Sequence, residues 1–292
     1  MSLTFAVGDF RVDRILEQEL PGFDPFEFFP TLTREMLDEH RHWLEPSALD
    51  PATGQLIFPM QSYLVRTGRH TILIDSCIGN HKPRTTRPNW HMKTDTTYMD
   101  ALARAGVGVE QVDFVMCTHL HPDHVGWNTR LLDGRWVPTF PNARYVFSKK
   151  ELAHWEARHA EAEIPYMTDS VLPVVAAGQV LQVTSDHALE DGIRLEPTPG
   201  HTPDHFSVHL TSAGSEAVMA GDLIHSPIQC RYPNLPARPD IDKQQAVATR
   251  TAFMERYCET DTLVCTAHFP SPSVGHLTRV GDAFGFRFRD AG

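Results

Sequence analysis

Short apolar runs that end abruptly in polar residues dominate the pattern of this chain, and β-branched residues are common in them. That pattern predicts β-strands whose ends turn into polar loops. The predicted strands lie near residues 3–15, 56–66, 70–75, 112–117, 143–147, 180–184, 193–197, 205–211, 216–220, 262–267 and 277–288. The predicted helices lie near residues 33–44, 95–105, 149–161 and 241–258. Clusters of strands separated by single helices are typical of a mixed α and β fold.

Three of the predicted helices have a candidate N-terminal cap. Thr94 or Asp95 would cap the second helix, Ser148 the third and Asp240 the fourth. Gly106 would end the second helix, because glycine readily adopts the left-handed conformation found there.

Three histidines and an aspartate crowd into six positions directly after one predicted strand. The strand at residues 112–117 is followed by Thr118 and then by His-Leu-His-Pro-Asp-His at residues 119–124. A strand that stops and turns can direct several side chains at one point. Imidazole nitrogen and carboxylate oxygen are ligands that suit zinc and similar divalent ions. A lone histidine is usually a surface or core residue, but this spacing predicts a metal site.

Further candidate ligands follow other strand-like runs. His201, Asp222 and His268 each stand where such a run gives way to a loop. Sites in sheet-based folds are commonly built from loops at strand ends, so these residues are the natural complement to the first cluster.

In seven residues of fixed order the chain resembles the metallo-β-lactamase superfamily of metallohydrolases. They are His119, His121, Asp123, His124, His201, Asp222 and His268. Gly126 and the Gly-His-Thr-Pro context of His201 also match, and the resemblance covers roughly residues 55–275. It is specific for the superfamily rather than for any one activity.

The resemblance implies a single domain over residues 1–292 with the superfamily's α/β architecture, an αββα sandwich of two mixed β-sheets flanked by helices. It also implies two divalent metal ions, with zinc as first choice and iron, manganese or cobalt as alternatives. The first ion would be held by His119, His121 and His201, the second by Asp123, His124 and His268, and Asp222 would bridge both. Asp75 would orient a ligand histidine, or else it is a turn residue at a strand end.

Hydrolysis by a hydroxide held between the two ions follows from the same resemblance, with Asp123 passing a proton to the leaving oxygen. The spacing at residues 119–124 and the pair Trp127-Asn128 look similar to the lactonase and organophosphate-hydrolase branch. We therefore expect an ester or lactone substrate, such as an acyl-homoserine lactone or an aryl ester. The alternatives are a phosphotriester and a thioester of the glyoxalase II type. Glyoxalase-type enzymes usually add a helical domain after the last ligand, and 24 residues follow His268 here.

The charge and composition of the chain limit the classes of partner that we expect it to bind. The formal net charge of −11 argues against a nucleic-acid surface, because phosphate binding needs clustered lysine and arginine. The N-terminal residues lack signal-peptide features and no apolar run reaches 18 residues, so we expect a cytoplasmic protein without a membrane span. The five cysteines are widely spaced, which favours reduced thiols, and Cys117 and Cys265 are expected to be buried. The expected partner is a small-molecule substrate, and a homodimer is left open.

Two segments depart from a minimal member of the superfamily. An insert at residues 20–54 opens with four phenylalanines in ten positions, and its prolines argue against regular structure there. Its rings would line the substrate pocket, form a subunit contact or fill the local core. Residues 79–93 carry four cations and form either a mobile lid over an anionic substrate or a solvated loop. The candidate substrate contacts in these segments are Phe28, Phe29 and Trp90.

Two more histidines lie close in sequence to predicted ligands. His205 follows His201 by four residues, and His225 follows Asp222 by three. Either could donate a hydrogen bond to a reacting oxygen or support a metal ligand from behind. We assign both, with Asp75, to the supporting shell of the site.

Overall fold

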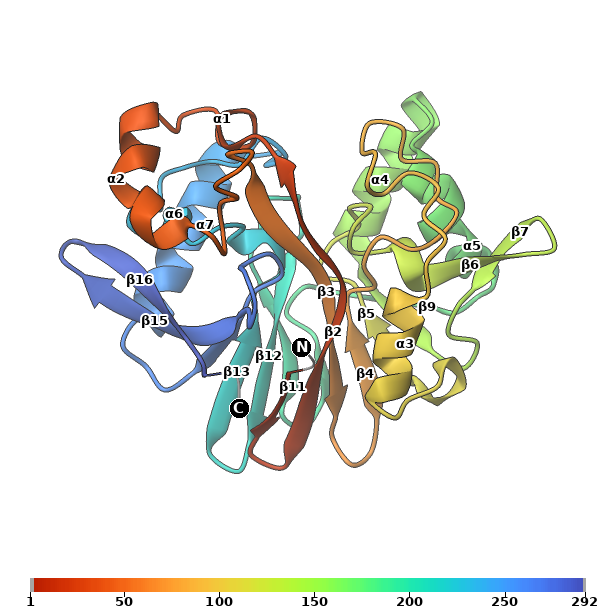
Figure 1. The fold of residues 1–292 in the computed structure, drawn as a ribbon. Coiled ribbons are helices and arrows are strands. Elements are labelled where there is room, and N and C mark those ends of the chain that lie inside the picture. The colour runs from red at the N-terminus through yellow and green to blue at the C-terminus, as the bar shows by residue number, and fades with distance from the viewer. Residues whose placement is uncertain (1–2, 291–292) are drawn as a thin grey trace. The chain divides into compact units, whose positions relative to one another are not determined.

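A computed structural model describes residues 3–290, and the chain divides into two compact units. The first unit consists of the described residues of Met1–Gln18 and Met60–His187, and the second of those of Glu19–Pro59 and Ala188–Gly292. The insert predicted at residues 20–54 therefore belongs to the second unit. Strands and helices are labelled in Figure 1.

The first sheet has the strand order β1-β2-β3-β4-β5-β8-β9. Its strands are β1 (Thr4–Val7), β2 (Phe10–Phe23), β3 (Leu56–Arg66), β4 (Thr71–Ile74), β5 (Phe114–Met116), β8 (Arg144–Ser148) and β9 (Val180–Val183). The last four run parallel, whereas β1 pairs with β2, and β3 with β4, in antiparallel fashion. Parallel strands end at the same edge of a sheet, so the residues that follow β4 and β5 come together.

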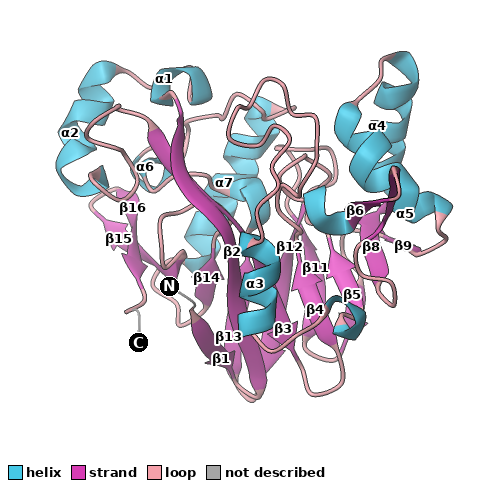
Figure 2. Cartoon of the chain, turned by 45° about the vertical axis from the view of Figure 1, so that its right-hand side comes forward, coloured by secondary structure: helices cyan, strands magenta, loops and turns pink. Residues whose placement is uncertain are grey.

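Helices α3 (Thr97–Arg104), α4 (Lys149–Glu161) and α5 (Leu172–Ala176) belong to the first unit. Tyr98 and Leu102 of α3 pack with Leu64 and Leu73 of the sheet in one apolar core, which also contains Trp155 of α4. In Figure 2, α3 lies in front of the strands of this sheet and runs roughly along their direction. A small antiparallel hairpin, β6 (Thr129–Leu132) and β7 (Arg135–Pro138), follows the histidine-rich segment 119–124.

The second sheet has the strand order β10-β11-β12-β13-β14-β15-β16. Its strands are β10 (Ala188–Glu190), β11 (Ile193–Pro197), β12 (Phe206–Ser212), β13 (Ser215–Met219), β14 (Leu263–Cys265), β15 (Val274–Val280) and β16 (Ala283–Phe288). Only β13 and β14 run parallel among the neighbouring pairs described. The loops after these two strands therefore meet at one edge.

The second unit also holds α1 (Pro25–Phe28), α2 (Arg34–Leu44), α6 (Ile228–Arg231) and α7 (Lys243–Tyr257). Phe253 and Met254 of α7 pack with Val218 and Val264 of the sheet in a second apolar core. That packing explains the apolar spacing along α7, because a helix buries one face against its sheet.

The four predicted helices are confirmed as α2, α3, α4 and α7. Ser148 caps α4 as predicted, because its hydroxyl accepts hydrogen bonds from two N–H groups of the first turn. The predicted cap of α7 is wrong. Asp242 holds that position and accepts a hydrogen bond from the first turn, whereas Asp240 is used elsewhere. At α3 the cap position is Thr96, although Asp95 accepts a hydrogen bond from the N–H of Thr97.

Several short elements escaped the sequence pattern. The expectation of no regular structure in residues 21–30 is wrong, because β2 runs to Phe23 and α1 follows it. Asp24 makes that short helix possible by accepting hydrogen bonds from Phe26 N and Glu27 N. The predicted strand 277–288 is two strands, β15 and β16, and the strands β6, β7 and β10 and helices α5 and α6 were not predicted.

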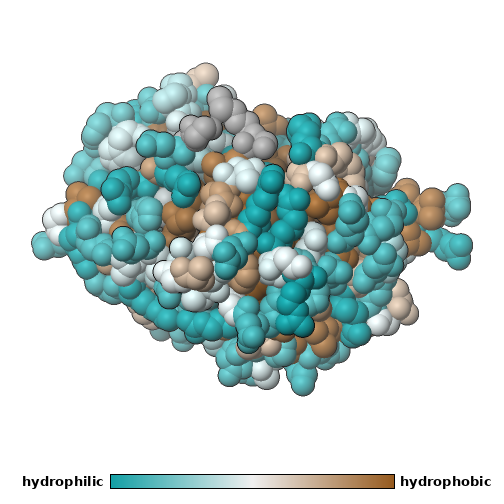
Figure 3. Space-filling model, turned by 90° about the horizontal axis from the view of Figure 1, so that it is seen from below, coloured by the Kyte–Doolittle hydropathy of each residue, from teal (hydrophilic) through white to brown (hydrophobic). Residues whose placement is uncertain are grey.

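The surface is mainly hydrophilic on the face that Figure 3 shows. Figure 3 shows hydrophobic side chains on this face in small patches. Leu131 and Leu132 of the β6–β7 hairpin are exposed. No helix formed by residues 3–290 is both long enough and apolar enough to cross a membrane. All five cysteines are free, and Cys117 and Cys265 are buried as predicted.

Candidate metal centre

The first group of candidate ligands follows β5 in the first unit. His119 and His124 are buried, whereas His121 and Asp123 are half-buried. The ring centroid of His119 lies 4.6 Å from that of His121 and 4.1 Å from that of His124. The turn after the strand thus gathers the imidazoles at one place, as the spacing predicts.

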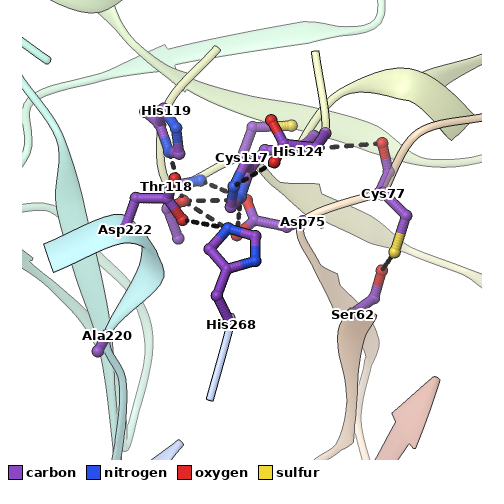
Figure 4. A network of polar contacts seen from close by, with 12 residues as sticks. Ser62, Asp75, Cys77, Cys117, Thr118, His119, His124, Ala220, Asp222 and His268 are labelled. Carbon is purple, nitrogen blue, oxygen red and sulfur yellow. Dashed lines mark hydrogen bonds and ion pairs between the residues drawn. The ribbon is translucent and has the colours of Figure 1, made fainter. Parts of the chain in front are cut away.

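Asp75 lies behind this cluster at the end of β4. Because β4 and β5 are parallel neighbours with Ile74 opposite Met116, the next residues of each strand meet. The Asp75 carboxylate accepts hydrogen bonds from Thr118 N at 2.8 Å and from His124 Nδ1 at 2.9 Å, as Figure 4 shows. Because Nδ1–H donates to Asp75, the lone pair on Nε2 of His124 remains available to bind a metal ion.

Thr118 fixes the tautomer of His119 in a similar way, through a hydrogen bond to its Nδ1. The hydroxyl of Thr118 donates to Asp75, so its oxygen accepts from His119 Nδ1 at 3.1 Å. His119 Nε2 therefore also carries a lone pair. A single carboxylate, Asp75, orders two histidines of the candidate site.

The second group of candidate ligands lies in the second unit. His201 follows β11, Asp222 follows β13, and His268 follows β14. The Asp222 carboxylate has one oxygen 3.3 Å from His201 Nε2 and the other 2.9 Å from His268 Nε2. Figure 4 shows Asp222 and His268 facing each other. A carboxylate with a different imidazole at each oxygen has the form expected of a bridging ligand.

The Nδ1 atoms of these two histidines are also engaged. His201 Nδ1 donates to Asp240 Oδ1 at 2.8 Å, and His268 Nδ1 donates to the carbonyl oxygen of Pro59 at 3.0 Å. Burial acts to raise the pKa of Asp240, but the hydrogen bond and charge of His201 hold that pKa below its usual value. The sequence predicts a helix cap at Asp240, because a carboxylate in a loop carries no pattern that marks it as a partner of His201.

The donor set fits divalent metal ions. Each of the four histidines His119, His124, His201 and His268 has Nδ1 committed to an oxygen acceptor, so Nε2 is the atom left to bind. Metal-binding histidines are held in this way, with the second nitrogen donating to a carboxylate, carbonyl or hydroxyl. Imidazole nitrogen and carboxylate oxygen are also the donor types that zinc and related divalent ions accept.

His205 positions Asp222. Its Nε2 accepts a hydrogen bond from Asp222 N at 3.0 Å, so its Nδ1–H donates to Thr198 Oγ1 at 2.8 Å. Both ring nitrogens are occupied within the second unit. His205 therefore supports the candidate ligand Asp222 and has no ring nitrogen left for a substrate.

His225 differs from His205. It is fully buried, with Nε2 3.3 Å from Asp222 Oδ2, and its Nδ1 has no hydrogen-bond partner among residues 3–290. Its ring lies 5.0 Å from that of His201 and stacks on that of His268 at 5.8 Å. Burial lowers the pKa of His225, which favours a neutral imidazole with one N–H to donate.

The phenylalanines of the insert surround these imidazoles within the second unit. Phe28 lies edge-on to His225 at 5.2 Å, and Phe58 lies 5.5 Å from His268. Phe23, which is half-buried, contacts both Phe28 and Phe58. Phe29 is fully buried and packs against Phe28 at 4.9 Å. Of the predicted substrate contacts in this unit, Phe28 touches His225, and Phe29 packs against Phe28 without touching an imidazole. Phe58, which contacts His268, is not among the residues that the sequence singles out.

Residues 79–93 form a loop that is exposed over much of its length but is anchored by buried cations. Lys82 and Arg84 are buried, and Arg84 makes a bidentate ion pair with Asp169 at 2.7 and 2.8 Å. Lys82 Nζ donates to Thr129 Oγ1 at 2.6 Å and to the carbonyl oxygen of Asp169 at 2.9 Å. Two of its four cations therefore anchor the loop inside the first unit instead of facing an anionic substrate.

The other end of this loop is tied to Glu17. Lys93 Nζ lies 3.1 Å from the fully buried Glu17 carboxylate, which also accepts from Ile78 N at 2.8 Å and Trp127 Nε1 at 2.9 Å. Trp90 is buried within the loop, with the guanidinium of Arg87 5.7 Å from its ring centre. A lone glutamate just after the predicted strand 3–15 gives no sign of this network.

Comparison with known proteins identifies the superfamily that the sequence resembles. The family model described as the metallo-beta-lactamase superfamily matches residues 58–268. The N-acyl homoserine lactonase AiiA of Bacillus thuringiensis subsp. kurstaki is 26% identical over 205 residues, 66% of this chain and 72% of the relative. The probable metallo-hydrolase YybB of Bacillus subtilis is 19% identical over 214 residues, 73% of this chain and 82% of the relative.

Two solved structures share the fold over nearly the whole chain. The dizinc quorum-quenching lactonase AidC has a TM-score of 0.81 at 19% identity, with 99% of this chain and 97% of AidC covered. The hydrolase AbOPH of the beta-lactamase superfamily has a TM-score of 0.80 at 24% identity, with coverage of 99% and 98%. These likenesses confirm the predicted fold class.

Proposed function

The chain belongs to the metallo-β-lactamase superfamily, and we propose that it is a two-metal hydrolase that opens lactones or cleaves carboxylic esters. The observation that carries the proposal is the locked tautomer of four candidate ligand histidines, which leaves Nε2 of each for a metal. The lactonase relatives support the substrate class. We treat residues 1–292 as one catalytic domain, with residues 20–54 as an insert.

Seven residues would hold the ions in this proposal. By the superfamily pattern, the first ion would take His119, His121 and His201, the second would take Asp123, His124 and His268, and Asp222 would bridge both. When bound, two such ions supply a hydroxide nucleophile at neutral pH and polarise a carbonyl group. Zinc is the first choice because imidazole and carboxylate are its usual ligands, and iron, manganese and cobalt accept the same set.

The protein's own groups have separate tasks. Asp123, with 13% of its side chain exposed, is open enough to carry a proton to the leaving oxygen. His225, neutral and short of a partner at Nδ1, is a donor for a substrate oxygen or a further support for Asp222. Phe28 and Phe58 supply an apolar wall beside His225 and His268, suited to an acyl chain or aryl ring.

Metal removal is the direct test of the metal centre. Protein purified without chelator should contain about two divalent ions per chain, and dialysis against a chelator should abolish hydrolysis. It should also lower the melting temperature, because ions that bind only the folded chain stabilise it. Elemental analysis and thermal melts measure both effects. A reproducible content of one ion or none after zinc, iron, manganese and cobalt have each been supplied would contradict the two-metal assignment.

The substrate class is tested by a hydrolysis screen of the metal-loaded protein. The panel contains N-acyl homoserine lactones of several chain lengths, aryl esters, thioesters and phosphotriesters. We expect the highest kcat/KM among lactones or aryl esters. A clear preference for phosphotriesters or thioesters would replace the ester proposal with one of those two alternatives.

Phe28 should set substrate choice and leave the metal chemistry alone. Phe28→Ala is expected to raise KM about tenfold for long-chain or aromatic substrates and to change it little for small ones, because it removes uniform binding. Phe29→Ala should instead lower the melting temperature, since a buried phenylalanine truncated to alanine costs about 3–5 kcal/mol.

The matched control is Phe26→Ala, on the same short helix but half-buried and in contact with Arg34 rather than with an imidazole. Kinetics on long and short substrates, with thermal melts of all three variants, separate pocket from packing. Equal KM ratios across substrate lengths in Phe28→Ala, with a loss of stability, would assign Phe28 to the core.

A further inference from the structure

Two buried side chains of helix α4 contact the histidine-rich segment 119–124. They are Glu151 and Trp155, which are four residues apart and therefore lie on the same face of the helix. Their exposed fractions are 1% and 6%. Nothing in the sequence pattern singles out either residue, and the proposed function does not use them.

The position of Glu151 follows from the start of the helix. Because Ser148 caps α4, Glu151 falls in the first turn, where the positive end of the helix dipole stabilises a carboxylate. Glu151 Oε1 accepts a short hydrogen bond from Trp155 Nε1 at 2.6 Å and a longer one from Leu120 N at 3.4 Å. Leu120 stands between His119 and His121, so the carboxylate is tied to the backbone of the segment that carries the candidate ligands.

The indole of Trp155 is fixed by this carboxylate and by its neighbours. A buried indole N–H needs a hydrogen-bond partner, and Glu151 provides it. The ring belongs to the apolar core of the first unit and packs against Tyr166, with centroids 5.6 Å apart. The same ring lies edge-on to His121, with centroids 5.4 Å apart. Trp155 thus presents a ring of fixed orientation to a candidate metal ligand.

His121 is the candidate ligand histidine that burial restrains least. It is half-buried, whereas His119, His124, His201 and His268 are buried. Its ring is flanked by the rings of His119, at 4.6 Å, and of Trp155. Of these two neighbours, only Trp155 lies outside the candidate ligand set. A rotation of the His121 ring away from the site would give up its contact with Trp155.

We propose that Trp155, fixed by Glu151, is a positioning residue that holds the His121 ring in the orientation that metal binding requires. The inference rests on the proposed two-metal centre, in which His121 belongs to the first ion by the superfamily pattern. A ligand that is already oriented loses little freedom when it binds, and the affinity is higher for that reason. Mutation of residues that orient metal ligands typically changes the metal affinity by a factor of about 10–100.

Trp155→Leu tests this role, because it removes both the ring and the N–H. The metal-free protein is titrated with Co²⁺, whose visible absorption reports binding, in competition with a chelator of known affinity. The wild type should bind two equivalents. In Trp155→Leu the dissociation constant of one equivalent should rise about 10- to 100-fold, while that of the other changes by a few-fold at most. The effect is confined to one equivalent because His121 would bind one ion.

Two milder variants keep the test decisive if Trp155→Leu does not fold. Trp155→Phe retains a smaller ring but loses the N–H, and it should weaken the same equivalent by less than Trp155→Leu. Glu151→Gln retains an oxygen for the indole N–H but removes the charge that strengthens this hydrogen bond. It should also weaken that equivalent by less than Trp155→Leu.

Trp127→Phe is the matched control. It removes another buried indole N–H that donates to a buried carboxylate of the same unit, Glu17, but its ring stacks on Tyr98 and not on an imidazole. It should lower the melting temperature of the metal-free protein and leave the dissociation constant of the affected equivalent as in the wild type.

A merely structural role for Trp155 would lower the melting temperature of its variants and leave both dissociation constants unchanged, and that result would overturn the proposal. Equal weakening of both equivalents, or the same weakening in Trp127→Phe, would overturn it as well. In each of these cases the two-metal centre of the wild type stands. A wild type that binds fewer than two Co²⁺ ions would instead refute the two-metal centre, and the role of Trp155 with it.

Discussion

We expect Asp123→Asn to lower kcat of the proposed two-metal hydrolase by about 100-fold or more, with the chain still folded and both metal ions still bound. Asparagine preserves the size of the side chain and one oxygen ligand but can neither accept nor deliver a proton at neutral pH. General acid–base catalysis typically contributes a factor of about 10²–10⁴, so the loss should fall in that range. Folding should survive because Asp123 lies in a turn after β5 and is half-buried, outside the apolar core of the first unit.

Steady-state kinetics on a lactone and an aryl ester measure this loss, with elemental analysis of the same preparation. Asp133→Asn is a suitable control, because Asp133 is an exposed turn residue of the first unit with φ of 48°, a conformation that asparagine also tolerates. Normal kcat in Asp123→Asn with two metals bound would show that another group carries the proton. Loss of one metal would instead make Asp123 mainly a ligand.

Local signals predicted the long elements of the fold well. The limits of α4 agree with the predicted helix 149–161, because Ser148 supplies a cap and the helix has one apolar face. The short elements were missed where tertiary contacts decide. Asp24 caps α1 within a proline- and phenylalanine-rich segment, and the ring of Phe28 in that helix then packs against Phe23 and Phe58. Periodicity over four residues carries too little information to predict such a helix.

The candidate ligands could be read from the sequence because they follow strands in a fixed order. Their hydrogen-bond partners could not. Asp240 and the carbonyl of Pro59 lie 39 and 209 residues from the histidines that they hold, and no local pattern encodes such pairs. The cations of residues 79–93 were misread for a similar reason. Lysine and arginine are almost always exposed, and only the buried carboxylate of Asp169, 85 residues beyond Arg84, overrides that expectation.

That carboxylate leads to the largest expected effect on stability. Asp169→Asn leaves Lys82 and Arg84 buried without their counter-charge, and breaking a buried ion pair in this way costs about 3–5 kcal/mol. The melting temperature should fall by roughly 10 °C. Glu163→Gln, an exposed residue close by in the chain, is the control and should shift it by about 1 °C or less. An unchanged melting temperature in Asp169→Asn would mean that the cations find water or other partners.

The pH dependence of the free energy of unfolding is a second test of the cluster formed by Lys82, Arg84 and Asp169. Burial lowers the pKa of Lys82 to about 7, although the charge of Asp169 acts to raise it. In the unfolded chain a lysine titrates near 10.4, so between about pH 7 and 10 the unfolded state binds a proton that the folded state has released. Stability must therefore rise with pH across this window, and the contribution of Lys82 is least favourable below pH 7.

Lys82→Met removes this titration. Denaturant unfolding from pH 6 to 10 should show a steeper gain in the free energy of unfolding for the wild type than for Lys82→Met. Parallel curves for the two proteins would mean that Lys82 stays protonated throughout, held by Asp169 more strongly than burial opposes it.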